Sequence, residues 1–401
     1  MFDLNRFIAE HITKRPKSLF AEDLVTRDAQ LRDSISGKRA LIIGGAGTIG
    51  SSFIRALLAY DPAGLVVVDT NENGLTELTR NLRSRVDLAM PAEYRTYPIS
   101  FAGPVFAKLL ANDPYFDIVA NFAAHKHVRS EKDHYSIEAM VRNNVIDAKH
   151  LLDKLLSRPP SRFFCVSTDK AANPVNVMGA SKKLMEEAIL AYSRDLHITT
   201  ARFANVAFSN GSLLFGFNER LMRRQPISSP SDVKRYFVSP DESGQLCLLA
   251  CICGTSGDIF FPKLGEEQMM TFSTIADAYL AAQGLTPKQY PTDAEARAAA
   301  STWQPGEPYP VYYFQTETSG EKSFEEFYTQ GEELDIKSFS ELGVIKNAPR
   351  PQVLEVERAI GKLERVFAKA DSSKADVVAA MSELVSGFAH IETGKSLDQR
   401  M

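Results

Sequence analysis

The sequence predicts an α/β protein with a doubly wound parallel sheet, a smaller C-terminal domain and helical extensions at both ends. From Lys38 onward, short apolar runs alternate with segments of helical spacing, as a parallel sheet with crossover helices requires. A glycine-rich turn at residues 44–50 separates the first apolar run from the first helical segment. The length of 401 residues exceeds the usual size of one hydrophobic core, so we expect more than one domain.

Six short runs are the strand candidates of this sheet. Between them lie segments of helical spacing, such as Ile49, Phe53 and Leu57 after the first run. Right-handed crossovers would bring the carboxyl ends of these strands to one crevice, where ligands bind in such sheets. The predicted strands are residues 40–43, 65–68, 94–97, 118–122, 163–166 and 199–203.

The chain divides into two domains and two extensions. After Asn205 the regular alternation stops and clusters of Gly, Ser and Pro follow, which is typical of a loop-rich second domain. Within that second domain, residues 233–262 are expected to return to the sheet domain. The predicted boundaries are 1–37 for an N-terminal helical extension, 38–206 for the sheet domain, 207–345 for mainly the second domain and 346–401 for a C-terminal helical extension.

Both extensions show helical patterns with apolar faces. In the N-terminal one, Phe7, Ile8 and Ile12 share a face that would pack on the main domain or on another subunit. The C-terminal one contains two amphipathic helix candidates, and residues 371–373 between them offer a cap for the second. The apolar residues of the two candidates are Val356, Ile360, Leu363 and Phe367, followed by Val377, Met381, Leu384 and Phe388.

Composition and charge are those of an ordinary globular enzyme. The net charge of −4 gives no sign of a surface for nucleic acid or for an anionic membrane. No apolar run approaches the roughly eighteen residues of a membrane span, and the N-terminus lacks a signal-peptide pattern. The cysteines lack metal-ligand histidines nearby, so we expect no metal site and a reduced, cytoplasmic protein. They are Cys165, Cys247, Cys251 and Cys253.

The glycine-rich turn has the spacing and the context of a dinucleotide site. Gly44, Gly47 and Gly50 lie between a predicted strand and a predicted helix. Small residues let the backbone approach a pyrophosphate, and the start of the helix, at Thr48 and Ile49, supplies free N–H donors and a partial positive charge. The sheet domain is therefore expected to be a Rossmann-type domain that binds a dinucleotide.

Asp69, at the end of the second predicted strand, indicates that this dinucleotide is NAD. A carboxylate at this place binds both ribose hydroxyls of NAD and repels the additional phosphate of NADP. An aspartate that only caps the following turn is the alternative. Ala123 and Ala124 follow the fourth strand, and their small side chains would let the adenosine half of the cofactor pass. We expect Asn71 in this cofactor site as well.

An acid lies beside a base directly after the fifth predicted strand. Thr168, Asp169 and Lys170 follow that strand and would face the crevice, and Lys182 comes twelve residues after Lys170, early in a predicted helix. Together with a bound dinucleotide, such a pair indicates acid–base chemistry on a substrate. The alternative is a surface turn with an exposed ion pair, which would contribute little to stability.

With these residues the chain resembles the extended short-chain dehydrogenase/reductases, and specifically the nucleotide-sugar 4,6-dehydratases of bacterial surface-polysaccharide synthesis. The resemblance extends over residues 38–326. Its specific element is the Thr-Asp-Lys triplet, because sugar epimerases with this fold generally lack it. The motifs that carry the resemblance are residues 44–50, 121–128, 143–145, 167–182, 202–211, 234–237 and 320–322.

The resemblance implies a reaction sequence on a nucleotide sugar, with UDP-N-acetylglucosamine as the expected substrate. A hydride passes from C4 to NAD, Lys170 removes the C5 proton as a neutral amine, and Asp169 protonates the hydroxyl that leaves C6. The hydride then returns to C6, while Thr168 hydrogen-bonds the C4 oxygen. Burial and a nearby cation are expected to lower the pKa of Lys170 for this task.

One position departs from the pattern of the superfamily. Most members have tyrosine four residues before the active-site lysine, whereas this chain has Met178 before Lys182. A thioether cannot accept the proton of the C4 hydroxyl, so that proton would pass to Asp169, Lys182 or a water. One branch of the 4,6-dehydratases resembles this chain in having methionine there. Members of that branch are often membrane-anchored, and we expect no such anchor here.

The resemblance also implies residues that hold the cofactor and the substrate. Arg235 has the charge and the fork geometry to bind a diphosphate. Most relatives have Arg-Pro before the Gly-Glu-Lys motif, whereas this chain has Thr318 and Ser319, which leaves the identity of the nucleotide open. Such enzymes usually form at least dimers, so we expect a homo-oligomer. The further implied contacts are Asn144 for the cofactor and Lys126, Asn205, Asn210 and Glu321 for the substrate.

Two other functions are compatible with the sequence. A nucleotide-sugar epimerase with the same fold would need no acid–base pair at Asp169 and Lys170. A catalytically silent protein that binds NAD or a nucleotide sugar would account for Met178 and for the unusual terminal extensions.

Overall fold

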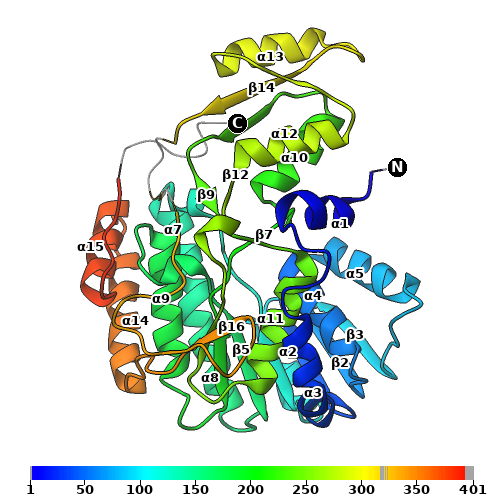
Figure 1. Ribbon diagram of the computed structural model, residues 1–401. Coiled ribbons are helices and arrows are strands. Elements are labelled where there is room, and N and C mark those ends of the chain that lie inside the picture. The colour runs from blue at the N-terminus through cyan, green and yellow to red at the C-terminus, as the bar shows by residue number, and fades with distance from the viewer. Residues whose placement is uncertain (1, 317–319, 321, 323, 393–401) are drawn as a thin grey trace.

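A nine-stranded sheet forms the centre of the large domain (Figure 1). Its strands are β1 (Arg39–Ile43), β2 (Gly64–Asp69), β3 (Glu93–Pro98), β4 (Ile118–Asn121), β5 (Arg162–Val166), β6 (Ile198–Ala201), β11 (Ile259–Pro262), β15 (Leu334–Asp335) and β16 (Leu342–Ile345). Their order is β15-β16-β11-β6-β5-β4-β1-β2-β3, and the strands from β11 to β3 pair in parallel. The predicted doubly wound α/β fold is therefore confirmed. The computed structural model describes residues 2–316, 320, 322 and 324–392.

The six predicted strands all occur, with ends that differ by one or two residues. β4 and β6 are buried along their whole length, as central parallel strands covered on both faces must be. The sequence had placed residues 342–345 in the second domain, but β16 pairs antiparallel with β11 and extends the large sheet. This four-residue run is buried throughout, and its partner strand lies far away in the sequence, so no local pattern identified it.

Helices cover both faces of the large sheet (Figure 1). One face carries α4 (Thr48–Leu58), α5 (Glu72–Ser84) and α11 (Pro240–Cys253); the other carries α7 (His134–Val141), α8 (Asp147–Leu155) and α9 (Val177–Leu190). α6 (Pro104–Asn112) connects β3 to β4. α11 packs closely on α4, because a Cβ at Gly244 would lie 2.3 Å from the backbone of Ser52. Residues 240–262 thus belong to the large domain in the structure, through α11 and β11.

A second, smaller domain lies above the carboxyl ends of the parallel strands (Figure 1). It has its own buried cluster, which includes Phe217, Ile275, Tyr279 and Val311. Two short strand pairs, β7 (Asn205–Val206) with β10 (Phe237–Val238) and β9 (Lys234–Arg235) with β12 (Met270–Thr271), lie where the chain passes between the domains. The domain consists of α10 (Leu213–Met222), β8 (Ile227–Pro230), α12 (Phe272–Ala282), β13 (Pro287–Gln289), α13 (Asp293–Thr302) and β14 (Tyr309–Phe314).

The N-terminal extension packs on both domains. It forms α1 (Leu4–Phe7), a π-helical segment (Ile8–Ile12), α2 (Ala21–Thr26) and α3 (Asp28–Ile35). The predicted apolar face of Phe7, Ile8 and Ile12 is buried in the cluster of the smaller domain. Phe20, farther along, is buried in the core of the large domain. The extension therefore bridges the two domains of its own chain.

The C-terminal extension forms α14 (Val353–Phe367) and α15 (Lys374–Leu384), which pack against each other and against α9. Ser373 caps α15 in a capping box with Asp376, as the residues between the two predicted helices suggested. The second helix ends at Leu384, so Phe388 lies beyond it, although its side chain is buried.

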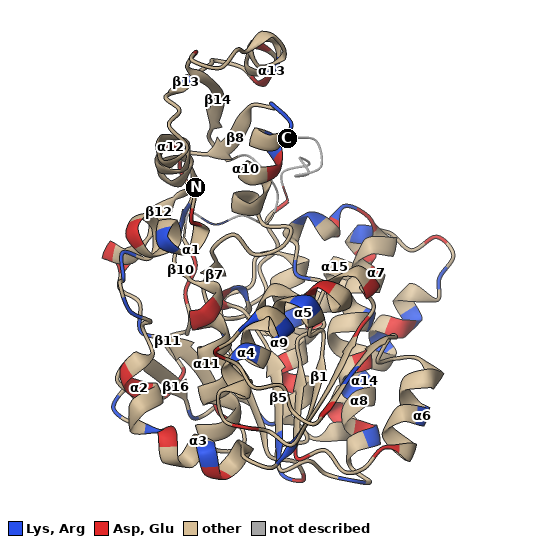
Figure 2. Cartoon of the chain, turned by 90° about the vertical axis from the view of Figure 1, so that its right-hand side faces the viewer, with Lys and Arg blue, Asp and Glu red and all other residues tan. Residues whose placement is uncertain are grey.

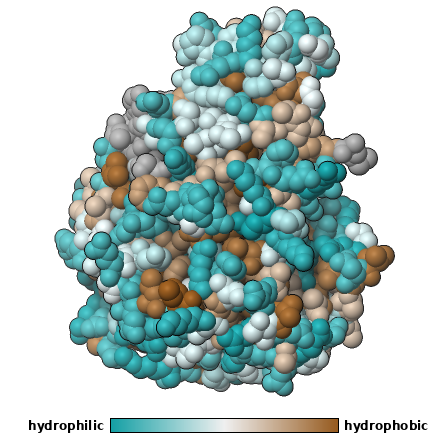
Figure 3. Space-filling model, viewed as in Figure 1, coloured by the Kyte–Doolittle hydropathy of each residue, from teal (hydrophilic) through white to brown (hydrophobic). Residues whose placement is uncertain are grey.

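The outer surface is mixed in charge and mostly hydrophilic. Lys and Arg alternate with Asp and Glu over the helices of the large domain (Figure 2). Apolar groups on the face seen in Figure 3 form small patches separated by polar side chains. Among the helices of the described residues, none is both long and apolar enough to span a membrane.

Candidate active site

A cavity of about 420 Å³ lies at the carboxyl ends of the central strands, next to the smaller domain. Its wall combines the glycine-rich turn with the segment after β5, as the sequence predicted for a single crevice. The predicted site residues that line this cavity are Gly44, Gly47, Thr48, Ile49, Gly50, Ala124, Lys126, Thr168, Lys170, Met178, Lys182 and Asn205.

The glycine-rich turn brings two backbones into close approach. Gly44 has φ of 74°, and a Cβ there would lie 2.4 Å from the amide nitrogen of Ala123. A Cβ at Gly50 would lie 2.4 Å from the carbonyl oxygen of Gly44, so the turn stays tight only with glycine at both positions. α4 starts after Gly47 without a side-chain cap. Its first N–H groups are therefore available to an anion in the cavity.

Asp69 stands at the edge of this turn. Its Oδ2 accepts a hydrogen bond from the amide of Ala46 at 3.0 Å, and its Oδ1 accepts one from the amide of Asn71 at 2.9 Å. The side chain of Asn71 caps α5 by accepting from the amide of Gly74. Asp69 is thus held directly beside the glycine-rich turn. Neither Asp69 nor Asn71 lines the cavity wall itself.

Asn144 holds two walls of the cavity together. Its buried amide group accepts from the backbone N–H of His125 at 2.9 Å and donates to the His125 carbonyl at 3.0 Å. It also donates to Oγ of Ser181, on α9, at 3.1 Å. Asn144 therefore connects the segment that carries Ala124 and Lys126 to the helix that carries Lys182, and it does not line the cavity.

The acid–base pair forms a compact, largely buried turn after β5. Oδ1 of Asp169 accepts from Oγ1 of Thr168 at 2.8 Å, from the amide of Lys170 at 2.9 Å and from Nζ of Lys170 at 3.0 Å. Asp169 is only 3% exposed, so the exposed surface turn considered from the sequence is excluded. Thr168 and Lys170 line the cavity, whereas Asp169 lies just behind them.

The pKa of Lys170 is shifted in the direction opposite to the one expected. Burial alone would lower it, but the negative charges of Asp169 and Glu325 outweigh burial and raise the pKa above the ordinary lysine value. Arg235, the nearby cation, opposes this rise without cancelling it. The two neighbouring carboxylates therefore favour the ammonium form of Lys170.

Glu325 is a site residue that the sequence reasoning missed. Its Oε1 is 3.8 Å from Nζ of Lys170 and 3.8 Å from Nη2 of Arg235, and its side chain is 3% exposed. Burial raises the pKa of Glu325 above its ordinary value, and the cations Lys170 and Arg235 oppose this rise without cancelling it. In the sequence it is one of two adjacent glutamates in a loop, and nothing in that local pattern distinguishes Glu325 from Glu326.

Lys182 and Met178 reach the cavity from the start of α9. Asn176 caps this helix, and Nζ of Lys182 donates to the carbonyl oxygen of Val166, at the end of β5, at 2.9 Å. Burial lowers the pKa of Lys182. Met178 is buried one helical turn earlier and presents its side chain to the cavity.

The expected substrate contacts lie at different depths. Nζ of Lys126 donates to the carbonyl of Asn210, and the amide of Asn210 donates to Oγ1 of Thr48, both at 2.9 Å. The loop after β7 thus crosses beside the glycine-rich turn. Arg235 is buried behind the cavity wall, where Nη1 donates to the carbonyls of Lys234 and Lys322. Glu321 lies outside the described residues.

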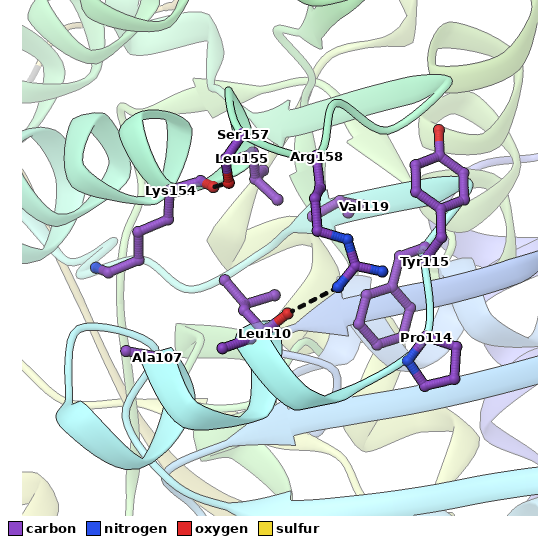
Figure 4. A pocket seen from close by; sticks show the side chains of 11 residues that line it. Ala107, Leu110, Pro114, Tyr115, Val119, Lys154, Leu155, Ser157 and Arg158 are labelled. Atoms are coloured by element: carbon purple, nitrogen blue, oxygen red, sulfur yellow. Dashed lines mark hydrogen bonds between the residues drawn. The ribbon is translucent and has the colours of Figure 1, made fainter.

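A second cavity, of about 280 Å³, lies between α6 and α8, against β4 (Figure 4). Its wall is mostly apolar, with Leu110, Tyr115 and Val119 among its residues. Arg158 is bound to the carbonyls of Leu110 and Asp113. The described residues that line this second cavity include no acid–base pair comparable to Asp169 and Lys170. Across the residues the structure describes, His, Cys, Asp and Glu form no cluster of three or more that is arranged to hold a metal ion.

Sequence comparison places this chain among proteins of polysaccharide synthesis. A family model described as "Polysaccharide biosynthesis protein" matches residues 40–347. An "Uncharacterized membrane protein MJ1061" of Methanocaldococcus jannaschii is 32% identical over 233 residues, which are 57% of this chain and 67% of that protein. The "Capsular polysaccharide biosynthesis protein CapD" of Staphylococcus aureus is 28% identical over 62% of this chain. This chain spans only 43% of the length of CapD.

A sequence relative is named as a dehydratase, and a solved structure with a similar fold is named as an epimerase. The "UDP-N-acetylglucosamine 4,6-dehydratase (inverting)" of Campylobacter jejuni is 26% identical over 57% of this chain and 68% of that protein. The structure of Pen from Bacillus thuringiensis superposes with a TM-score of 0.63, at 20% identity, over 79% of this chain and 90% of that one. The structure of the UDP-glucose 4-epimerase of Thermotoga maritima superposes with a TM-score of 0.53, at 19% identity, over 73% of this chain and 90% of that one. At such identities these structures show a shared fold.

Proposed function

This chain belongs to the polysaccharide biosynthesis protein family, and from this premise we propose that it is an NAD-dependent enzyme acting on a nucleotide sugar. We further propose that its reaction is the 4,6-dehydration of a UDP-N-acetylhexosamine, with UDP-N-acetylglucosamine as the first candidate. The observation that carries the second proposal is the Thr168–Asp169–Lys170 turn. It presents a buried acid–base pair at the cavity that also contains the glycine-rich turn.

The residues around the glycine-rich turn fit a dinucleotide. The close approach at Gly44 and the uncapped start of α4 leave backbone N–H groups free for a pyrophosphate. Asp69 is held beside the turn, where a ribose would lie in a fold of this kind. When bound, NAD would supply the hydride acceptor for C4 and return the hydride to C6.

The remaining steps fall to the side chains after β5. Lys170 removes the proton from C5, and Asp169 protonates the hydroxyl that leaves C6. These roles require a neutral amine and a protonated carboxyl. Because Nζ of Lys170 lies 3.0 Å from Oδ1 of Asp169, the transfer of one proton along this hydrogen bond produces both states at once. The raised pKa of Lys170 in the free protein is compatible with this arrangement, since the pair shares one proton.

In this proposal Thr168 hydrogen-bonds the C4 oxygen, and a second group accepts the proton of the C4 hydroxyl. Thr168 lines the cavity and would hydrogen-bond the oxygen as the hydroxyl becomes a ketone. Met178 cannot accept the hydroxyl proton, so Asp169, Lys182 or a water takes it instead. Burial lowers the pKa of Lys182, which favours the neutral amine that this step requires.

Product analysis separates the candidate functions. The protein is incubated with NAD and UDP-N-acetylglucosamine, and the sugar is followed by NMR. A methyl doublet from C6 together with a C4 ketone or its hydrate is expected. A changed ring configuration without the methyl group would instead assign an epimerase, to which the similarity with UDP-glucose 4-epimerases also leads. No turnover, also with other UDP-hexoses, would leave a binding protein.

A further inference from the structure

A buried carboxylate joins the proposed base to a buried arginine. Oε1 of Glu325 is 3.8 Å from both Nζ of Lys170 and Nη2 of Arg235. These three side chains come from three separate segments: the turn after β5, strand β9 and the loop that follows Lys322. Because Glu325 and Arg235 are almost fully buried, water and salt screen these charges little.

Among the residues that the structure describes, few other charges surround Glu325. Asp169 contacts Lys170 directly, so the ammonium of Lys170 has two carboxylate neighbours. Lys322 belongs to the same loop as Glu325 and attracts it, while its own ammonium donates to the carbonyl of Asn173. Glu325 therefore faces the cations Lys170, Arg235 and Lys322, with Asp169 as the neighbouring anion.

We propose that Glu325 is a positioning residue for the base: anchored by Arg235, its carboxylate holds the Lys170 ammonium as a second partner beside Asp169 and fixes Nζ at the cavity wall. A lysine side chain is long and flexible, and one contact alone leaves it several rotamers. Two carboxylates on separate segments restrict the ammonium to one place, which is what a base aimed at one carbon requires. This inference rests on the proposed function, in which Lys170 is the base.

The contact has a measurable electrostatic consequence. A carboxylate 3.8 Å away stabilises the ammonium form, so Lys170 releases its proton at a higher pH than it would beside Asp169 alone. Removing the charge of Glu325 should therefore lower the pH at which Lys170 titrates by about one unit. The same removal should free the side chain and lower the maximal rate by roughly tenfold. A residue that only supported the fold would not move the titration of Lys170.

The test compares Glu325→Gln with Glu326→Gln in the NAD-loaded protein. Glu326 is the adjacent residue, is exposed and bonds Asn173, so its variant is the matched control. Lysine labelled with ¹³C at Cε reports the titration of Lys170, whose resonance is identified by its loss in Lys170→Arg. The dependence of kcat on pH is measured in parallel. We expect the midpoint of the Lys170 titration and the midpoint of the kcat profile to move to lower pH in Glu325→Gln. Both midpoints should be unchanged in Glu326→Gln.

An unchanged Lys170 midpoint in Glu325→Gln, or an equal shift in Glu326→Gln, overturns the inference. If Glu325→Gln does not fold, Glu325→Asp replaces it, and a smaller shift in the same direction is expected. The proposed function fails separately if the unaltered protein converts no nucleotide sugar. In that case a shifted Lys170 titration would leave the contact standing but overturn its assignment to this reaction.

Discussion

Oδ2 of Asp69 accepts a hydrogen bond from the amide of Ala46 at 3.0 Å, so the carboxylate at the end of β2 is bound to the glycine-rich turn itself. This contact places a fixed negative charge beside the turn that would bind a pyrophosphate. The charge disfavours a second phosphate on the ribose next to it. The selectivity for the cofactor should therefore depend on this one side chain.

The purified protein should carry NAD and little NADP. Asp69→Ser should reduce this preference by tenfold or more, because it removes the carboxylate that binds the ribose hydroxyls of NAD and repels the phosphate of NADP. A difference of about 1.4 kcal/mol between the two binding free energies corresponds to one factor of ten. Mass spectrometry of the denatured protein identifies the bound cofactor, and titration gives the two affinities. A parent protein that carries mainly NADP would refute the assignment.

Lys170→Ala should abolish dehydration while leaving the affinities for NAD and the nucleotide sugar nearly unchanged. The expected loss is roughly 10²–10⁴-fold in kcat, the usual contribution of a general base. Lys170→Arg is the control, because it keeps a cation near Asp169 but cannot become a neutral base. Exchange of the C5 proton with deuterated water should stop in both. Persistence of that exchange at the parent rate would exclude Lys170 as the base.

The rate should fall in the alkaline range, where the pair of Lys170 and Asp169 loses the proton that it shares. The pKa of Lys170 is raised, so the ammonium persists into the alkaline range in the free protein, and the limb of kcat/KM that reports the free enzyme should lie there. Asp169→Asn should remove most activity at every pH. A parent profile that is flat across neutral and alkaline pH would contradict the role given to the pair.

Met178→Tyr tests the departure from the superfamily pattern. In the proposed mechanism another group takes the C4 proton, so a phenol at this buried position only adds bulk, and we expect activity that is unchanged or lower. Turnover is compared with that of the parent at equal NAD occupancy. A large gain from a nearly inactive parent would favour a protein that has lost catalysis.

A surface ion-pair network should make stability depend on pH. Arg39 donates twice to Glu93, at 2.8 and 2.7 Å, and together with Arg95 it lowers the pKa of Glu93 from 4.5 to about 2 against the effect of burial. The stabilisation is complete above 4.5 and disappears as the pH falls towards 2. Because Glu93 is one-third exposed, Glu93→Gln should cost only about 1 kcal/mol at pH 7.

Urea unfolding at pH 7 and at about pH 3, between the two pKa values of Glu93, measures this cost. Glu77→Gln, at the weaker and exposed pair with Arg80, is the control and should change little. An equal cost for Glu93→Gln at both pH values would contradict the linkage.

Much of the framework was determined by the sequence alone, because the relevant physics is local. Runs such as residues 40–43 are apolar on both faces, and between helical segments this pattern indicates a strand that is covered on both sides. The glycine spacing requires a tight turn before a helix, and Asp69 follows from its place at the end of a strand. The segment of Thr168, Asp169 and Lys170 was likewise predictable as a unit, since its members are consecutive in the chain.

Tertiary structure decided which distant groups act on these residues. Glu325 reaches Lys170 from a loop far away in the sequence, and its negative charge, together with that of Asp169, reverses the pKa shift expected for Lys170. Similarly, only folding showed that Phe7 packs into the smaller domain and that β16 extends the large sheet. Local patterns encode the neighbours along the chain, whereas the electric field and the packing at a buried site are sums over segments that the chain brings together.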